Sequence, residues 1–195
     1  MDLFLAISQG TGLALATGMR PFLPPLLAGA FARADVGIDF TGTDYSFLES
    51  VPFLAVMVVL VLVGTASERV RGTRAVVLAT GTVAAALGAL EFAGSLADEG
   101  HQATAGLPAG AVCALLGFLA ALSFLAGAHA RLRAQGQSGP ASYLGLYADF
   151  AAVVVALLAI FLPPASYLPL ALSAWLLVAR RRRAARKYEG LRVLR

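Results

Sequence analysis

The chain has 195 residues, of which 59% are apolar and 13% are charged. A soluble domain is nearer half apolar and a quarter charged, so the excess apolar surface points to lipid as the solvent. The formal net charge is +4, but eight of the fifteen Lys and Arg residues follow Ala179, directly beyond an apolar stretch, and no basic groove pattern with aromatic residues accompanies them. We therefore expect membrane lipid, and no nucleic acid, as a partner.

The first predicted span covers residues 3–19 and ends at Arg20 and Pro21. The start of the chain, Met-Asp-Leu-Phe, has no basic region, so we interpret it as retained helix rather than a cleaved signal peptide. A second apolar piece follows at residues 21–32 and contains three prolines. Because proline removes backbone donors, we expect a break that leaves one span and a half-helix, which is re-entrant, interfacial or spanning.

Five more apolar segments follow, most of them near the ~20 residues needed to cross the hydrocarbon core. They cover residues 51–67, 75–96, 106–130, 143–162 and 166–179, and a basic tail occupies residues 180–195. Pro163 and Pro164 separate the last two segments, and one kinked span over residues 143–179 is the alternative. We predict an all-α, polytopic transmembrane helix bundle of about six spans, in a single domain over residues 1–195.

The charges between the spans follow the positive-inside rule. With the C-terminus in the cytoplasm, the arginines at residues 69–74 and 131–133 fall inside, and the acidic loops at residues 33–50 and 98–101 fall outside. Only Arg33 departs from this pattern. The Arg-rich, Lys-poor composition suggests a bacterium. The predicted location is the bacterial cytoplasmic (inner) membrane, with both termini in the cytoplasm.

Three charged residues interrupt apolar helices: Arg20, Glu91 and Asp149. Each has small residues at helical spacing on its face, which is typical of a helix–helix contact. Counting ~1.5 Å per residue from the inner ends of the spans puts Arg20 and Glu91 at similar depth, toward the outer side. We hypothesise that they form an ion pair or share a polar pocket. The alternatives are that Arg20 reaches the headgroups while Glu91 is protonated or interfacial, and that Asp149 is a solvated carboxylate near the inner boundary.

Gln9 is the fourth candidate substrate- or ion-binding residue, beside Arg20, Glu91 and Asp149. The break after Arg20 adds a possible anion site. Gln9 has the side chain to hydrogen-bond across helices. A helix that restarts after Pro21 or Pro24 presents free N–H groups with partial positive charge, so the helix start and Arg20 together favour an anion. The alternative is a structural kink whose N–H groups bind water or loop atoms.

Residues with reactive or metal-binding side chains are few and scattered. Cys113 is the only cysteine, and His101 and His129 lie on opposite predicted sides of the membrane, so we expect no metal and no other cofactor. Serine and cysteine occur in no recognisable nucleophile motif. We therefore predict that the protein is not an enzyme. A membrane enzyme acting on lipids is the least supported alternative, because no reactive group of residues indicates it.

Two short motifs carry a resemblance to a known family. Residues 17–24 read TGMRPFLP and residues 188–195 read YEGLRVLR. Both resemble an uncharacterised family of small bacterial multi-helix membrane proteins, classed as a domain of unknown function, and the helix layout is similar. The resemblance implies a membrane fold and directs attention to Arg20, but no substrate. The chain departs from the family at residues 64–68, GTASE, where one acid of an expected acidic pair is missing.

The polar residues inside the apolar helices lead to two functional hypotheses. The first is a small membrane transporter or channel, for an anionic solute or a lipid headgroup, that binds at Arg20 and uses Glu91 or Asp149 as the coupling or gating carboxylate. The second is a non-catalytic membrane scaffold or assembly factor whose basic tail docks on anionic lipid or on a partner. Short spans rich in alanine and glycine are also compatible with a homo-oligomer.

Overall fold

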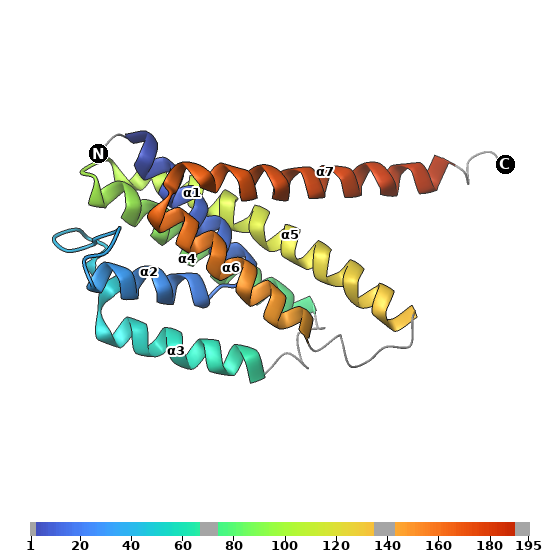
Figure 1. Cartoon of the computed structure of the whole chain (residues 1–195), viewed down its shortest axis with the longest axis horizontal. Helices are drawn as coiled ribbons and strands as arrows, with labels where there is room; N and C mark the ends of the chain where they lie inside the picture. Colours follow the sequence, from blue (N-terminus) through green and yellow to red (C-terminus); the bar gives the residue numbers. More distant parts are fainter. Residues whose placement is uncertain (1–2, 67–73, 135–142, 190–195) are drawn as a thin grey trace.

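The structure is a computed structural model that describes residues 3–66, 74–134 and 143–189 (Figure 1). These residues form an all-helical bundle without strands, which confirms the all-α class. The α-helices are α1 (Leu3–Met19), α2 (Leu23–Arg33), α3 (Val51–Ala66), α4 (Arg74–Asp98), α5 (Gly106–Ala134), α6 (Tyr143–Phe161) and α7 (Tyr167–Glu189). Three short 3-10 turns are η1 (Ser46–Glu49), η3 (Ala103–Ala105) and η5 (Pro163–Ser166).

Three stretches of this bundle are long and apolar enough to cross a membrane, namely Ala75–Asp98, Ala103–Ala128 and Leu144–Phe161. Leu3–Met19 and Val51–Gly64 are apolar but shorter. These helices agree with a membrane protein, while the number of six spans stays a prediction. The expected border between the last span and the tail, at residue 180, is no helix end, because α7 continues through the arginines to Glu189.

Helix α1 occupies the centre of the bundle. Every residue from position 8 to position 18 is buried, and α1 packs against α2, α4, α5, α6, α7 and η5. A helix that is buried on all faces needs neighbours that approach closely from every side, and small residues permit this. Gly18 lies against the Ala114 carbonyl of α5, and Gly12 lies against Ala159 of α6 and Ser166 of η5.

The helices alternate in direction, and the two ends of the bundle differ in charge (Figure 1). The acidic end contains the start of α1, residues 34–50 between α2 and α3, and the connection from α4 to α5, and its acids are Asp35, Asp39, Asp44, Glu49, Asp98 and Glu99. The basic end contains the ends of α3 and α5, the starts of α4 and α6, and the C-terminal half of α7. Arginines at residues 69–74, 131–133 and 180–183 lie in or next to these elements in the chain.

The start of α1 and the end of α7 lie at opposite ends of the bundle (Figure 1). This differs from the expectation that both termini lie on one side. The reason is α2, which returns from the basic end toward the acidic end and packs between α3 and α6 as a helix of its own. The half-helix after the break therefore reverses the direction of the chain once more before α3 begins.

We expect Gly18→Ala to destabilise the bundle by about 1–3 kcal/mol, because a Cβ at this position would clash with the Ala114 carbonyl oxygen and α1 would have to move away from α5. The measurement is thermal unfolding of the purified protein in detergent. Gly127→Ala on α5 is the matched control, since a Cβ there meets nothing within 4 Å, and it should be neutral or stabilising by up to ~1 kcal/mol. Equal effects of both changes would contradict the close packing of α1.

Candidate functional site

The break between α1 and α2 sets the position of Arg20. The Arg20 N–H still donates to the Ala16 carbonyl (3.0 Å), as in a regular helix, and Pro21 then ends α1. Pro24 and Pro25 occupy the first turn of α2 and carry no N–H. The start of α2 therefore offers fewer free donors than the sequence analysis assumed, and the preference for an anion rests on the Arg20 side chain.

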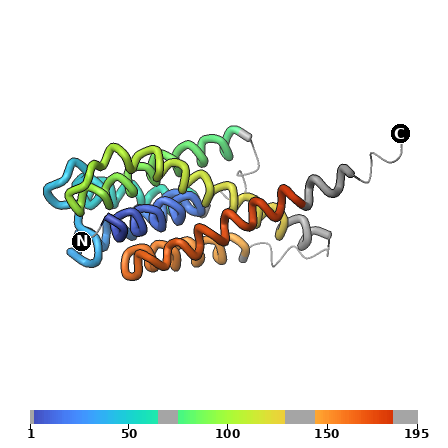
Figure 2. Tube along the Cα trace, turned by 90° about the horizontal axis from the view of Figure 1, so that it is seen from above, coloured from blue at the N-terminus to red at the C-terminus, as the bar shows by residue number. Residues whose placement is uncertain are grey.

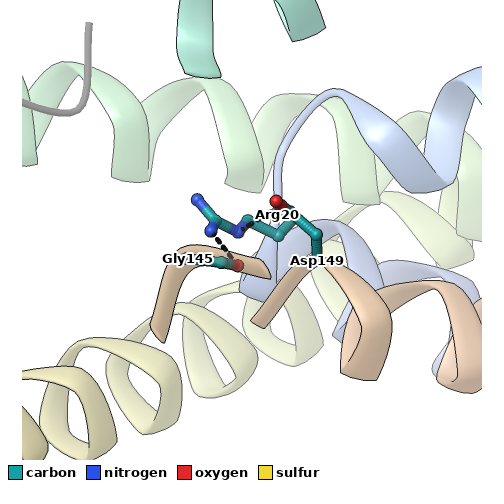
Figure 3. A network of polar contacts seen from close by, with 3 residues as sticks. All are labelled: Arg20, Gly145 and Asp149. Atoms are coloured by element: carbon teal, nitrogen blue, oxygen red, sulfur yellow. Dashed lines mark hydrogen bonds and ion pairs between the residues drawn. The ribbon is translucent and has the colours of Figure 1, made fainter. Parts of the chain in front are cut away.

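Arg20 pairs with Asp149 on α6 (Figure 3). Its Nε lies 2.7 Å from Asp149 Oδ1, and its Nη2 donates to the Gly145 carbonyl oxygen at 2.5 Å, one turn earlier on α6. The Arg20 side chain is 10% exposed and the Asp149 side chain is 29% exposed. The charge pair thus connects the end of the central helix to α6, and the carboxylate is its more accessible partner.

A cavity of about 170 Å³ adjoins this pair toward the basic end. Its lining comes from α1, α3, α4, α5 and α6, together with the α1–α2 connection and the first residue of α2. Most of the lining residues are apolar, among them Val61, Val76, Val77, Phe118, Leu122 and Leu125. Arg20, Asp149 and Thr80 supply its polar groups. An apolar wall strengthens the attraction between Arg20 and any anion, because the effective dielectric constant is low. The cavity suits a small anion with an apolar portion.

Glu91 does not pair with Arg20, so the hypothesis of an ion pair between them is wrong. The Thr17 hydroxyl donates a hydrogen bond to Glu91 Oε2, and Glu91 is 1% exposed. The cavity beside Arg20 is lined by other residues, so Glu91 does not share that pocket either. The error follows from the direction of α1, which begins at the acidic end and brings Arg20 toward the basic end, where α6 starts.

Gln9 lies near the other end of α1, about 16 Å from Arg20 along the helix. Its Nε2 donates to the Gly37 carbonyl (2.8 Å), and it borders a second cavity of about 520 Å³ at the acidic end. Asp35, Asp39 and Asp98 also line this cavity. The backbone N–H of Thr41 and then its hydroxyl lower the pKa of Asp39, so this cavity is anionic at neutral pH.

The structure thus joins two of the four candidates, Arg20 and Asp149, and separates Glu91 and Gln9 from them. The sequence analysis missed Thr17 and the Gly145 carbonyl. Thr17 precedes Arg20 by three residues and therefore lies on a neighbouring part of the helix surface. This spacing is the sequence signal that could have identified Thr17. Within the described residues, no cluster of His, Cys, Asp and Glu side chains is arranged to hold a metal ion.

We expect Arg20→Ala and Asp149→Ala to be non-additive, with a coupling of about 0.5–3 kcal/mol in the free energy of unfolding, because each change removes the same contact. The double-mutant cycle is measured by unfolding in detergent. Arg20→Ala combined with Gln9→Ala is the control, since these two side chains lie at opposite ends of α1. A coupling for Arg20 and Asp149 no larger than in the control would contradict the ion pair.

Among the comparisons with known proteins, the one with family models gives a match. No match was found among curated proteins or among solved structures. A family model described as Domain of unknown function (DUF4126) matches residues 7–183, which include all the candidate residues and the motif at residues 17–24 but not the motif at residues 188–195. With most of its length matched, the chain belongs to this family of unknown function.

Proposed function

We propose that this protein is a small membrane transporter for an anionic solute, which binds at Arg20 by taking the place of Asp149. The observation that carries the proposal is the Arg20–Asp149 pair beside an apolar cavity (Figure 3). Transport of an anion needs a cation in the bundle interior and a way to release the anion again. Arg20 supplies the cation, and the Asp149 carboxylate competes for it and promotes release.

The two cavities support transport rather than simple binding. One adjoins Arg20 on the side of the basic end and the other adjoins Gln9 at the acidic end, and the central helix α1 touches both. Between them α1 is packed against glycine and alanine of α4 and α5. This arrangement fits a state that is closed between two vestibules, which is the form of a transporter at one stage of its cycle.

We further propose that the basic end faces the cytoplasm of a bacterium, in the inner membrane. The arginines that flank the helices gather at this end, while the acids outside the helices gather at the other. In this orientation the Arg20 cavity lies toward the cytoplasmic side, and α1 starts on the outer side. No chemical step is needed for such a function, in line with a protein that is not an enzyme.

A non-catalytic scaffold or assembly factor is the second candidate. Helix α7 favours it, because α7 runs past the start of α6 as one continuous helix and carries exposed arginines, including Arg180 and Arg182 (Figures 1 and 2). A projecting basic helix is suited to anionic lipid or to an acidic partner. In this alternative the buried polar contacts only hold the helices together.

The orientation predicts which loops react with reagents outside the cell. Cys113 is the only cysteine, so single reporters are introduced in a Cys113→Ala background. We expect Asp44→Cys, at the acidic end, to react with a membrane-impermeant maleimide on intact cells, and Arg182→Cys to react only after permeabilisation. The reverse labelling pattern would place the basic end outside.

The transport proposal predicts opposite effects for the two partners of the ion pair. In proteoliposomes tested with chloride, phosphate and short-chain monocarboxylates, Arg20→Ala should lower flux at least about tenfold, since it loses one charge contact worth ~1.4 kcal/mol or more. Asp149→Asn should lower the KM for the anion, because the competing carboxylate is gone. Initial rates of uptake at several anion concentrations separate KM from kcat.

Arg33→Ala is the matched control for the flux assay, because Arg33 is exposed at the end of α2, far from the cavity of Arg20. It should transport like the wild type. No flux for any anion with the folded wild-type protein would sink the transporter proposal. Stable co-purification with one partner would then move the assignment to a scaffold, and co-purification of an anionic lipid that Arg20→Ala loses would identify a headgroup as the ligand.

A further inference from the structure

We propose that Glu91 is the proton-binding site of the transporter, which takes up and releases one proton in the middle of the bundle and couples this step to anion binding at Arg20. This inference rests on the transport function proposed above and extends it from the carried anion to the coupling ion. The only bonds that change are O–H bonds, because one forms on Glu91 as one breaks on the hydronium ion that supplies the proton. The Glu91 carboxylate accepts a proton from water, and the neutral acid later returns that proton to water.

The geometry around Glu91 is that of a neutral carboxylic acid. Glu91 is 1% exposed, Oε2 accepts the hydrogen bond of the Thr17 hydroxyl, and Oε1 has no hydrogen-bond partner among the described residues. An ionised carboxylate with a single neutral donor would carry an uncompensated charge in an apolar interior, which is strongly unfavourable. A proton on Glu91 removes that charge.

Among the side chains that the structure describes, no cation pairs with the Glu91 carboxylate. Helix α4 packs against α1, α5 and η3. On α1 the titratable side chain nearest in sequence to Thr17 is Arg20, which pairs with Asp149. On α5 the Cys113 thiol is free and partly buried, and η3 carries no titratable side chain. On α4 itself, Asp98 lies about two turns away at the acidic end.

The position of Glu91 suits coupling. Along α4 it lies between Thr80, which borders the Arg20 cavity, and Asp98, which borders the cavity at the acidic end. On α1 its partner Thr17 lies one turn before Arg20, about 4.5 Å along the helix. A change of charge at Glu91 therefore acts on the same turn of α1 that holds the anion site, and a neutral Glu91 leaves Arg20 more attractive to an anion than an ionised one.

The test is infrared spectroscopy of the protein reconstituted in lipid. At neutral pH the wild type should show the C=O band of a buried protonated carboxyl group, and this band should disappear reversibly at high pH. Glu91→Gln should lack it, while Glu49→Gln, which changes an acid at the acidic end, should retain it. Labelling the wild type with [13C]glutamate should lower the frequency of the band. This shift assigns the band to a glutamate even where Glu91→Gln does not fold.

Thr17→Val supplies a second variant of similar shape without the hydroxyl. It should keep the band but move it to higher frequency, since the C=O group loses a hydrogen bond. Absence of the band at neutral pH would overturn the proposal, because Glu91 would then be ionised. A band that no pH between 5 and 10 removes would overturn it as well, because a proton that never leaves couples nothing.

Transport measured with a pH gradient gives the coupling itself. With one anion per proton, a gradient of one pH unit should concentrate the anion about tenfold in the alkaline compartment, and Glu91→Gln should exchange the anion without concentrating it. The same chloride, phosphate and monocarboxylate panel serves as the probe. If none is carried, the infrared result still decides whether Glu91 exchanges a proton, so a failure of transport and a failure of the proton site are distinguished.

Discussion

The burial of α1 on all sides is the constraint on which the rest of the structure depends. A helix of 17 residues in the centre of a small bundle is possible only where its neighbours come close, and glycine and alanine on α1, α4 and α5 permit that approach. Close packing also fixes what polar groups on α1 contact. Each polar side chain on or next to α1 has few neighbours within reach and makes a hydrogen bond or ion pair with another segment. These side chains are Ser8, Gln9, Thr17 and Arg20.

Most helices were predictable from the sequence, because apolar stretches, prolines and charged loops mark their ends, but the arginines after residue 179 do not end α7. The prediction of α1 at residues 3–19 has the same bounds as the helix. Its direction in the bundle was not predictable, since this depends on whether residues 21–32 return as a helix or stay at the surface. The sequence of two apolar segments joined by prolines is the same whether the second segment returns across the bundle or stays at the surface. In the structure α2 returns, because it packs between α3 and α6.

The candidate site shows the consequence of that single uncertainty. All four candidates were found by their polarity within apolar helices, yet the pairing of Arg20 with Glu91 assumed that α1 starts at the basic end. In the observed direction of α1, Arg20 lies near the start of α6, and Asp149, which follows Tyr143 by six residues, becomes its partner. Small residues on one face indicate that a helix contact exists, but they do not say which helix provides it.

The Arg20–Asp149 pair has two roles in the proposed mechanism, and they are physically connected. It borders a cavity, and it also joins the end of α1 to α6 at a place where α1 gives way to α2 through a proline-limited connection. An anion that replaces Asp149 on Arg20 therefore removes a contact between two helices while it binds. Because the lost contact joins the end of α1 to α6 and not to α4 or α5, a movement that follows binding would begin at α6 and α2. Binding and movement then share one interaction, which is what coupling between a ligand and a conformational change requires.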